Sequence, residues 1–188
     1  MNHEYDDDDR GRPPAPAEVG ARASVRTAPP SIETTEDGKL LQRGRGPVKA
    51  TPPLALAEQV LAAQAFNDLV GARITRFGYG EAILELDIAD HHRQQFGLVH
   101  GGVLAYLVDN ALTFACGTVL GPGIVSSGLT VNYLAGARDG VLRATGTVTA
   151  YDERHAVATV RIDEVAVDGS VRACAVGQGS AVAASPSV

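Results

Sequence analysis

Residues 94–110 carry the groups of this 188-residue chain that are best suited to chemistry. They run through His100-Gly101-Gly102 into an almost entirely apolar run that holds one carboxylate, Asp109. Such a carboxylate can act as a general base. Free N–H groups at the start of a helix can stabilise a developing oxyanion, and glycine lets a substrate carbonyl approach the backbone closely. The segment therefore combines a candidate general base with a candidate oxyanion donor.

The spacing of Gly101 and Asp109 limits how they can cooperate. The two residues are eight positions apart, which on one helix separates them by about 12 Å at ~1.5 Å per residue. One carbonyl cannot accept a hydrogen bond from the first while a water held by the second attacks its carbon. If both act on one substrate, they must come from different protomers. The spacing therefore predicts a dimer with two shared sites.

Regular elements precede this segment. A helix is expected after Pro52-Pro53, over residues 54–66, with Gly71 as a stop. Two strands are expected at residues 72–77 and 81–89, because apolar and polar residues alternate strictly in the second. They are separated by three turn residues, which predicts an antiparallel hairpin.

The central segment and the chain after it complete the fold. From residue 101 to about 118, apolar residues occupy all sides of the helical wheel, which is typical of a helix covered on most sides. Asp109 and Asn110 at its midpoint argue against a membrane span. The pattern then predicts four strands joined by short turns, which demand antiparallel neighbours. Their ranges are 124–134, 141–151, 156–167 and 171–182. We therefore expect an α+β fold in which a curved antiparallel sheet of about six strands wraps a long central helix.

The first 50 residues differ in composition from the rest. They hold six of the ten prolines, nine acidic and eight basic residues, and Tyr5 as the one aromatic. Such a segment buries too little apolar surface to offset chain entropy. We therefore predict a disordered tail over residues 1–50 and one domain over residues 51–188.

Charge and motif content argue against several classes of protein. The net charge of −6 argues against binding to nucleic acid or, through basic residues, to a membrane surface. Cys116 and Cys174 cannot form a disulfide framework, and no Cys or His pair has the spacing of a zinc site. His91-His92-Arg93 is expected to be an exposed loop. The N-terminus lacks the features of a signal peptide, so we expect a cytoplasmic protein.

The order of elements, together with His100-Gly101-Gly102, Asp109 seven residues beyond the second glycine, and the following Asn110, resembles the hotdog-fold acyl-CoA thioesterases, in particular their PaaI/THEM2-like group. The resemblance covers residues from about 55 to 183. It implies a sheet wrapped round the helix, homodimers whose sheets join edge to edge, and often dimers of dimers. It also implies an acyl-CoA substrate that is cleaved to a carboxylic acid and coenzyme A, with no metal or redox cofactor.

The resemblance assigns roles to individual residues. It makes Asp109 the general base or nucleophile and the Gly101 N–H the oxyanion donor, with His100 shaping the loop. Relatives commonly place an Asn that positions the water or thioester where this chain has Gln94. Here Gln is one methylene longer, and Gln95 is the alternative.

Further residues are expected near the substrate. Relatives carry a Ser or Thr near the attacking water on the strand after the helix, which corresponds to Ser126 or, equally, to Ser127. The backbone of Gly102 lies beside the oxyanion donor, and Tyr106 is expected in the core or, with Phe114, in the lining of an acyl pocket. The basic residues of the folded region are all arginines, which suit phosphate recognition. Among those in turns, we select Arg138 and Arg154 as candidates for contact with coenzyme A.

Two other functions are compatible with this pattern. One is a hydroxyacyl-thioester dehydratase on the same fold, in which a His and an acidic residue transfer protons, although here His100 opens a His-Gly-Gly turn. The other is a non-catalytic acyl-CoA-binding module, which the replacement of the usual Asn by Gln94 keeps open. The sequence does not reveal the acyl group.

Overall fold

A computed structural model of the chain describes residues 33–34, 40–42, 45–47 and 52–184. In the first 50 residues, three strands of two or three residues pair as a small antiparallel sheet. They are β1 (Glu33–Thr34), β2 (Leu40–Gln42) and β3 (Arg45–Pro47). The rest of the predicted tail lies outside the described residues, so its disorder and its boundary at residue 50 stay predictions.

Two short helices, α1 (Leu54–Ala62) and α2 (Ala65–Val70), stand where the sequence predicted one. The prediction of a single helix is wrong because the backbone becomes extended at Gln64, which starts α2 afresh. Gly71 ends α2 with φ at 78°, a left-handed conformation that glycine adopts at little cost, so the predicted stop is confirmed.

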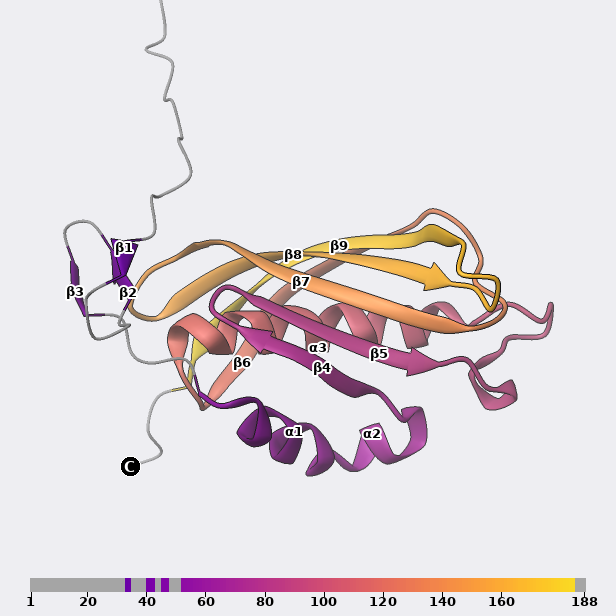
Figure 1. Cartoon of the computed structure of the whole chain (residues 1–188), viewed down its shortest axis with the longest axis horizontal. Helices are drawn as coiled ribbons and strands as arrows, with labels where there is room; N and C mark the ends of the chain where they lie inside the picture. Colours follow the sequence, from indigo (N-terminus) through magenta and orange to yellow (C-terminus); the bar gives the residue numbers. More distant parts are fainter. Residues whose placement is uncertain (1–32, 35–39, 43–44, 48–51, 185–188) are drawn as a thin grey trace, which may run out of the picture. The chain divides into compact units, whose positions relative to one another are not determined.

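Six strands form one antiparallel sheet around the 20-residue helix α3 (Gly101–Leu120). Their order in the sheet is β4-β5-β7-β8-β9-β6, so β4 and β6 are the edges. Figure 1 shows the curved sheet lying along the length of α3. The predicted α+β hotdog architecture is confirmed. The strands are β4 (Arg73–Gly78), β5 (Glu81–Asp87), β6 (Ile124–Tyr133), β7 (Val141–Tyr151), β8 (His155–Val165) and β9 (Val171–Ala183).

Small residues in the sheet let α3 approach it closely. A Cβ at Gly146 on β7 would overlap the carbonyl of Ala111, and one at Gly177 on β9 would overlap Val108. Both helix residues are fully buried. By length and composition α3 could cross a membrane, but 72% of its most apolar window is buried inside the fold, as in the core helix of a wrapped sheet.

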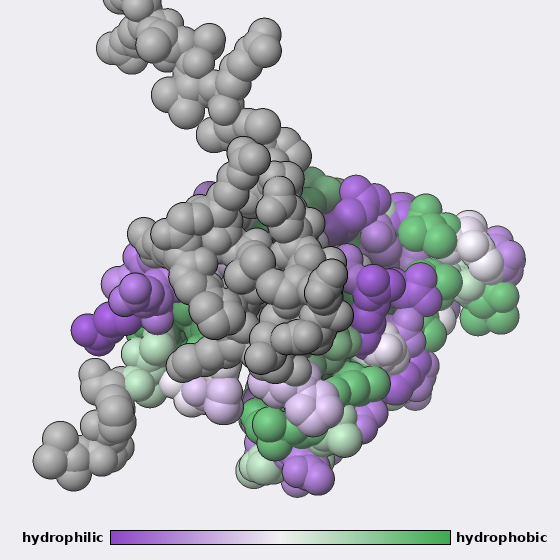
Figure 2. Space-filling view, turned by 60° about the vertical axis from the view of Figure 1, so that its left-hand side comes forward, coloured by the Kyte–Doolittle hydropathy of each residue, from purple (hydrophilic) through white to green (hydrophobic). Residues whose placement is uncertain are grey.

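In the part of the chain that the structure describes, large apolar side chains are exposed at several places, and two of these places hold at least three such side chains each. One is the pair α1 and α2, where Val60 and Phe66 are exposed. The other is the edge strand β6, where Val125, Leu129 and Tyr133 are exposed. Figure 2, in which the left side of Figure 1 faces the viewer, shows groups of hydrophobic residues at the described surface.

Candidate active site at helix α3

His100 forms the N-terminal cap of α3. Its backbone is extended, and its Nδ1 accepts a hydrogen bond from the Gly102 N–H at 2.9 Å. Its carbonyl accepts from the Val103 N–H at 2.9 Å. The imidazole therefore satisfies one of the N–H groups that every helix start leaves unpaired and fixes the shape of the loop.

The Gly101 N–H makes no hydrogen bond within the described residues, so it can serve as a donor at the positive end of the α3 dipole. The Gly101 carbonyl accepts from the Tyr133 hydroxyl of β6 at 3.1 Å. A Cβ at this position would lie 3.2 Å from the Tyr133 ring, which is too tight for ordinary packing. Glycine here therefore brings the edge strand against the start of the helix.

Asp109 lies two turns into α3, half-buried, and the described residues of one chain give it no hydrogen bond or ion pair. Its neighbour one turn back is Tyr106, whose hydroxyl donates to Asn67 Oδ1 at 2.8 Å. Burial, and after it the charge of Asp109, raise the pKa of Tyr106 to about 12, so this phenol stays protonated near neutral pH. The carboxylate is therefore unengaged beside a fixed, neutral tyrosine.

The structure places Gly101 and Asp109 on one continuous helix, which confirms the geometry behind the predicted spacing. At ~1.5 Å per residue they stand about 12 Å apart. One chain therefore does not bring the candidate base and the candidate oxyanion donor to a single carbonyl.

The two candidate serines of β6 lie at a β-bulge, between Ser126 and Gly128. Ser126 pairs with Ala181, which is fully buried, so Ser126 lies on the helix side of the sheet because paired residues share a face. Ser127 is the extra residue of the bulge, and its Oγ lies 2.9 Å from the Ser180 Oγ. Of the two, Ser126 is the one on the same side as α3.

Gln94 lies half-buried in the loop before α3, and its side chain is used locally. Its Oε1 accepts a hydrogen bond from the Phe96 N–H, and the Gln94 backbone N–H donates to the Leu98 carbonyl at 2.8 Å. The side-chain carbonyl thus closes a turn of its own loop. Gln95, the alternative, is exposed.

The predicted exposure of the His91-His92-Arg93 loop is wrong at its middle residue. His92 is only 3% exposed, its Nδ1 accepts from the Ala89 N–H at 3.0 Å, and its Nε2 lies 2.8 Å from the Val70 carbonyl. Burial lowers the pKa of this imidazole, which is therefore neutral near pH 7. The error arises because residues 90–92 form a short 3-10 helix, which turns His92 inward. The His92 carbonyl accepts from the His100 N–H at 2.7 Å and so holds the start of α3.

The sequence did not identify Glu164 of β8, which holds the turn beside the loop. Its Oε1 accepts from the N–H groups of Arg138 at 2.6 Å and Asp139 at 3.1 Å, and its Oε2 from Arg172 at 2.6 Å. Burial alone would raise the pKa of the carboxyl, but these donors together hold it below its usual value. The signal was present, because Glu164 falls on the buried phase of an alternating strand.

Arg93 links the same turn to the loop that precedes α3. Its guanidinium donates to the Gly97 carbonyl at 3.1 Å and to the Arg138 carbonyl at 2.6 Å. The Val99 N–H donates to the Ala137 carbonyl at 2.9 Å and adds a backbone connection. The loop that ends at His100 is therefore fixed from two sides.

The two arginines selected for coenzyme A lie far apart. Arg138 precedes β7, exposed, with its guanidinium 4.0 Å from where a Gly97 Cβ would stand. Arg154 follows β7, exposed, in the turn to β8. A strand of 11 residues separates them, which is roughly 36 Å at ~3.3 Å per residue. Only Arg138 lies at the loop that leads to His100.

An apolar cavity of about 180 Å³ lies between α1, β4 and the second half of α3. Asn110 and Thr113, which follow Asp109 on the helix, contribute to its wall, and so does Phe114. Tyr106 does not line it; this residue packs edge-on against Phe66 of α2. Of the two aromatic residues expected at an acyl pocket, the structure places Phe114 at a cavity.

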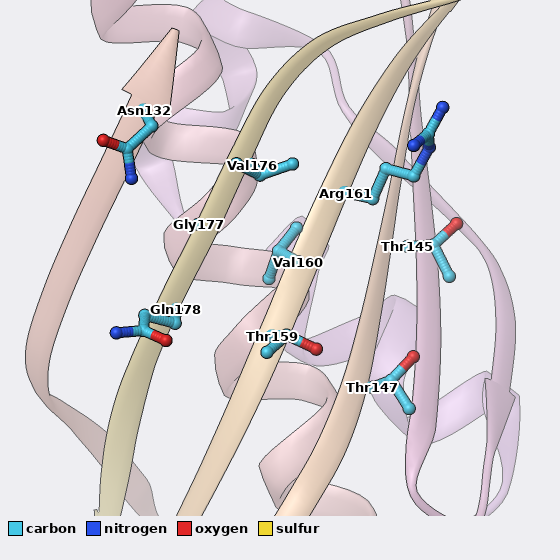
Figure 3. Close-up of a pocket in the computed structure, with 9 residues that line it drawn as sticks. All are labelled: Asn132, Thr145, Thr147, Thr159, Val160, Arg161, Val176, Gly177 and Gln178. Atoms are coloured by element: carbon cyan, nitrogen blue, oxygen red, sulfur yellow. The ribbon is translucent and has the colours of Figure 1, made fainter. Parts of the chain in front are cut away.

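A larger hollow of about 560 Å³ lies on the outer face of the sheet and is lined mainly by polar side chains of β6 to β9, such as Thr145, Thr159 and Gln178 (Figure 3). Its one charged group, Arg161, is paired with Asp163 at 2.9 Å. The hollow lies on the opposite side of the sheet from α3 and its carboxylate. Its lining therefore includes none of the predicted site residues.

Metal and thiol chemistry find little support in residues 52–184 and the short described strands before them. These residues contain no group of three or more His, Cys, Asp or Glu side chains that could hold a metal ion. Cys116 is fully buried, and burial raises the pKa of its thiol to about 11. It is therefore not a thiolate nucleophile at neutral pH.

Residues 96–165 match the family model of the Thioesterase superfamily. The chain is 28% identical over 81 residues to a 1,4-dihydroxy-2-naphthoyl-CoA hydrolase of Listeria monocytogenes serotype 1/2a (strain 10403S). That match spans 42% of this chain and 66% of the relative, slightly less than two thirds of its length.

Solved structures with the same fold cover more of the chain. The conserved protein PA5202 from Pseudomonas aeruginosa is 27% identical with a TM-score of 0.60, over 69% of this chain and 98% of that one. The PaaI protein of the E. coli phenylacetic acid degradation operon is 22% identical with a TM-score of 0.60, over 71% and 97%. At 22% identity the likeness to PaaI concerns the fold. The predicted resemblance to hotdog-fold thioesterases is confirmed by these matches.

Proposed function

This chain has the hotdog fold and matches the Thioesterase superfamily over residues 96–165, and from that premise we propose that it hydrolyses an acyl-CoA thioester. The observation that carries the proposal is the pair of open groups on α3. Among the described residues of its own chain, the half-buried Asp109 carboxylate has no partner and the Gly101 N–H has no acceptor. The Listeria relative, which is a CoA hydrolase, supports the same reaction.

In the proposed reaction Asp109 accepts a proton from a water molecule as the water oxygen attacks the thioester carbon. The Gly101 N–H donates to the oxyanion that develops on the carbonyl oxygen. The C–S bond then breaks, and the thiolate of coenzyme A takes up a proton. The products are a carboxylic acid and coenzyme A, and no metal or redox group takes part.

We propose a homodimer in which each site combines Asp109 of one chain with Gly101 of the other. The edge strand β6 supports this arrangement, because an edge presents unpaired backbone groups that a second copy can use. Val125, Leu129 and Tyr133 on this strand are exposed in the single chain and would be covered by the partner. A further pairing of dimers is compatible with the fold.

Other residues complete the proposed site. Ser126, on the helix side of β6, would lie near the attacking water, and the exposed guanidinium of Arg138 would meet a phosphate of coenzyme A. Gln94 is the weakest member, since its carbonyl already closes its own loop. This engagement is also the observation that favours the second candidate, a module that binds acyl-CoA without cleaving it.

The first test measures thiol release from a series of acyl- and aroyl-CoA thioesters by the wild type and by Asp109→Asn. We expect Asp109→Asn to lower kcat by about 10²–10⁴-fold, the usual contribution of a general base. Asp68→Asn is the matched control, because Asp68 is exposed on α2. Thermal stabilisation by acyl-CoA without any thiol release would favour the binding module, and hydration of an enoyl-CoA would favour the dehydratase.

The shared site has its own test, by mixing two inactive variants. Gly101→Pro removes the N–H at a helix position that tolerates proline, and Gly101→Ala adds similar bulk beside Tyr133 but keeps the N–H. Co-refolding Gly101→Pro with Asp109→Asn should restore roughly a quarter of the wild-type activity, since half of the random dimers have one intact site. Activity that stays absent in the mixture, while Gly101→Ala is active, would contradict a shared site.

A further inference from the structure

The cavity beside α1 is lined by elements that are far apart in the sequence. Leu56 comes from α1, Phe77 from β4, Phe114 and Gly117 from α3, and Ile124 from the start of β6. The four side chains among them are apolar, and the lining also includes polar Gln64, Asn110 and Thr113. A mainly apolar lining of this kind favours an apolar occupant.

The position of the cavity relates it to the candidate base. Thr113 follows Asp109 by four residues, so the two lie on the same face of α3, one turn apart. Thr113 lines the cavity, as does the buried Asn110 next to Asp109. The wall of the cavity therefore begins within one helical turn of the carboxylate. A thioester whose carbonyl lies near Asp109 can extend its acyl group along α3 into this space.

We infer, resting on the proposed function, that this cavity receives the acyl group of the substrate and that Gly117 sets how large the group can be. A volume of about 180 Å³ is well below the ~300–1,000 Å³ of pockets for drug-sized ligands. An apolar cavity of about 150 Å³ holds one benzene ring. The volume therefore matches single rings or chains of about six carbons better than long fatty acyl groups.

Gly117 is suited to this role because of what stands opposite it. It lies two turns beyond Asp109 on α3, half-exposed, and a Cβ there would meet the Ile124 Cδ1 at 3.6 Å, an ordinary contact. A larger side chain would therefore extend into the cavity without striking backbone. Replacing a helical glycine also raises helix propensity, so a filling variant is expected to fold.

The test compares three variants by kcat/KM on CoA thioesters of two to twelve carbons and on benzoyl-CoA. Gly117→Leu fills the cavity, and Leu56→Ala enlarges it. Leu54→Ala is the matched control for the second, because Leu54 is on the same helix with 37% exposure against 38% for Leu56 but does not line the cavity. Each methylene gained or lost in an apolar pocket changes discrimination by about 10–200-fold.

We expect Gly117→Leu to lower the ratio of hexanoyl-CoA to acetyl-CoA hydrolysis at least tenfold. Leu56→Ala should shift the preferred acyl group to a longer chain, and Leu54→Ala should leave the profile as in the wild type. An unchanged chain-length profile in both cavity variants, with activity retained, would overturn the inference and leave the proposed function standing.

A second measurement does not depend on turnover. In the Asp109→Asn background, the Kd of hexanoyl-CoA is measured with and without Gly117→Leu. The inference requires binding at least tenfold weaker in the double variant, even if no thioester is cleaved by the wild type. Equal binding by the two proteins would overturn it.

Discussion

The two faces of α3 differ in what they tolerate. The face toward the sheet consists of fully buried side chains such as Val108, Leu112 and Ala115, and it meets glycines of β7 and β9 with no space between. The opposite face carries Asp109, Thr113 and Gly117, which are half-exposed. On that second face, Asp109 has no hydrogen-bond partner among the described residues. On the first face, Val108, Leu112 and Ala115 carry no polar side-chain group.

The residues that specify the fold and those that are available for chemistry therefore lie on different faces of α3. Interiors are packed as densely as organic crystals, so a change on the sheet side of α3 must act on stability. A change on the other side meets solvent, the cavity or a partner chain, and can alter activity while the fold persists. One helix can therefore combine a rigid support with an open site, since the two sets of residues alternate along it.

The largest effect is expected when a side chain is forced between the sheet and the helix. In Gly146→Val, the new Cβ would overlap the Ala111 carbonyl, and neither backbone can move without disturbing the sheet or α3. We expect a loss of more than about 4 kcal/mol in the free energy of unfolding, which is exceptional for one substitution. Urea unfolding followed by circular dichroism measures it.

Gly78→Val is the control for this prediction. Gly78 is also a strand glycine, on β4, but no atom lies within 4 Å of a Cβ built there. Its substitution should change the free energy of unfolding by less than about 1 kcal/mol. Equal stability of the two variants would show that the sheet does not need a glycine under Ala111.

A smaller effect distinguishes neighbours on opposite faces of the helix. Leu112 is fully buried against Gly179, so Leu112→Ala should cost about 2–5 kcal/mol through lost burial and a cavity. Thr113→Ala should change stability by less than about 0.5 kcal/mol, since the residue is half-exposed and alanine favours helices.

The same pair is then compared on acyl-CoA substrates. Thr113→Ala should alter the acyl preference because Thr113 lines the cavity, while Leu112→Ala should retain the wild-type preference at a temperature where it is folded. If Leu112→Ala changed the preference and Thr113→Ala destabilised the chain, the assignment of faces would be reversed.

The order of elements could be predicted because runs and alternations of apolar residues are local signals. The apolar run from residue 101 predicted α3 to within two residues, and strict alternation located β5. The break between α1 and α2 was missed, since nothing in the residues 63 and 64 signals an extended backbone. Short-range patterns therefore locate an element more reliably than they locate a break within it.

The candidate site could be predicted only in part. Asp109 and Gly101 were identifiable because a carboxylate in an apolar run and glycines at a helix start are local signals. The burial of His92 depends on the Val70 carbonyl 22 residues away, and the cavity joins Leu56 to Ile124. Such contacts are set by the tertiary fold, so no local pattern reveals them.

The smallest effect concerns the loop before α3 and the turn beside it, which Glu164 holds. Because donors from Arg138, Asp139 and Arg172 lower the pKa of Glu164 in the folded chain, the unfolded chain binds a proton more readily. Stability from this group is complete above its ordinary pKa of 4.5 and is lost as the pH falls through the lowered value in the folded state. Glu164→Gln should therefore cost about 1.5–3 kcal/mol at pH 7 and less in acid.

Urea midpoints of the wild type and Glu164→Gln, measured at pH 7 and at pH 3.5, test this expectation. The gap between the two proteins should narrow at the lower pH, because below the ordinary pKa of 4.5 the unfolded chain takes up a proton at this carboxyl and is thereby favoured. Glu153→Gln is the control, since Glu153 is exposed in the turn between β7 and β8 and should give wild-type midpoints at both pH values. A gap that is absent at pH 7 would mean that the turn holds the loop through Arg93 and the backbone alone, and that the start of α3 is independent of the buried carboxylate.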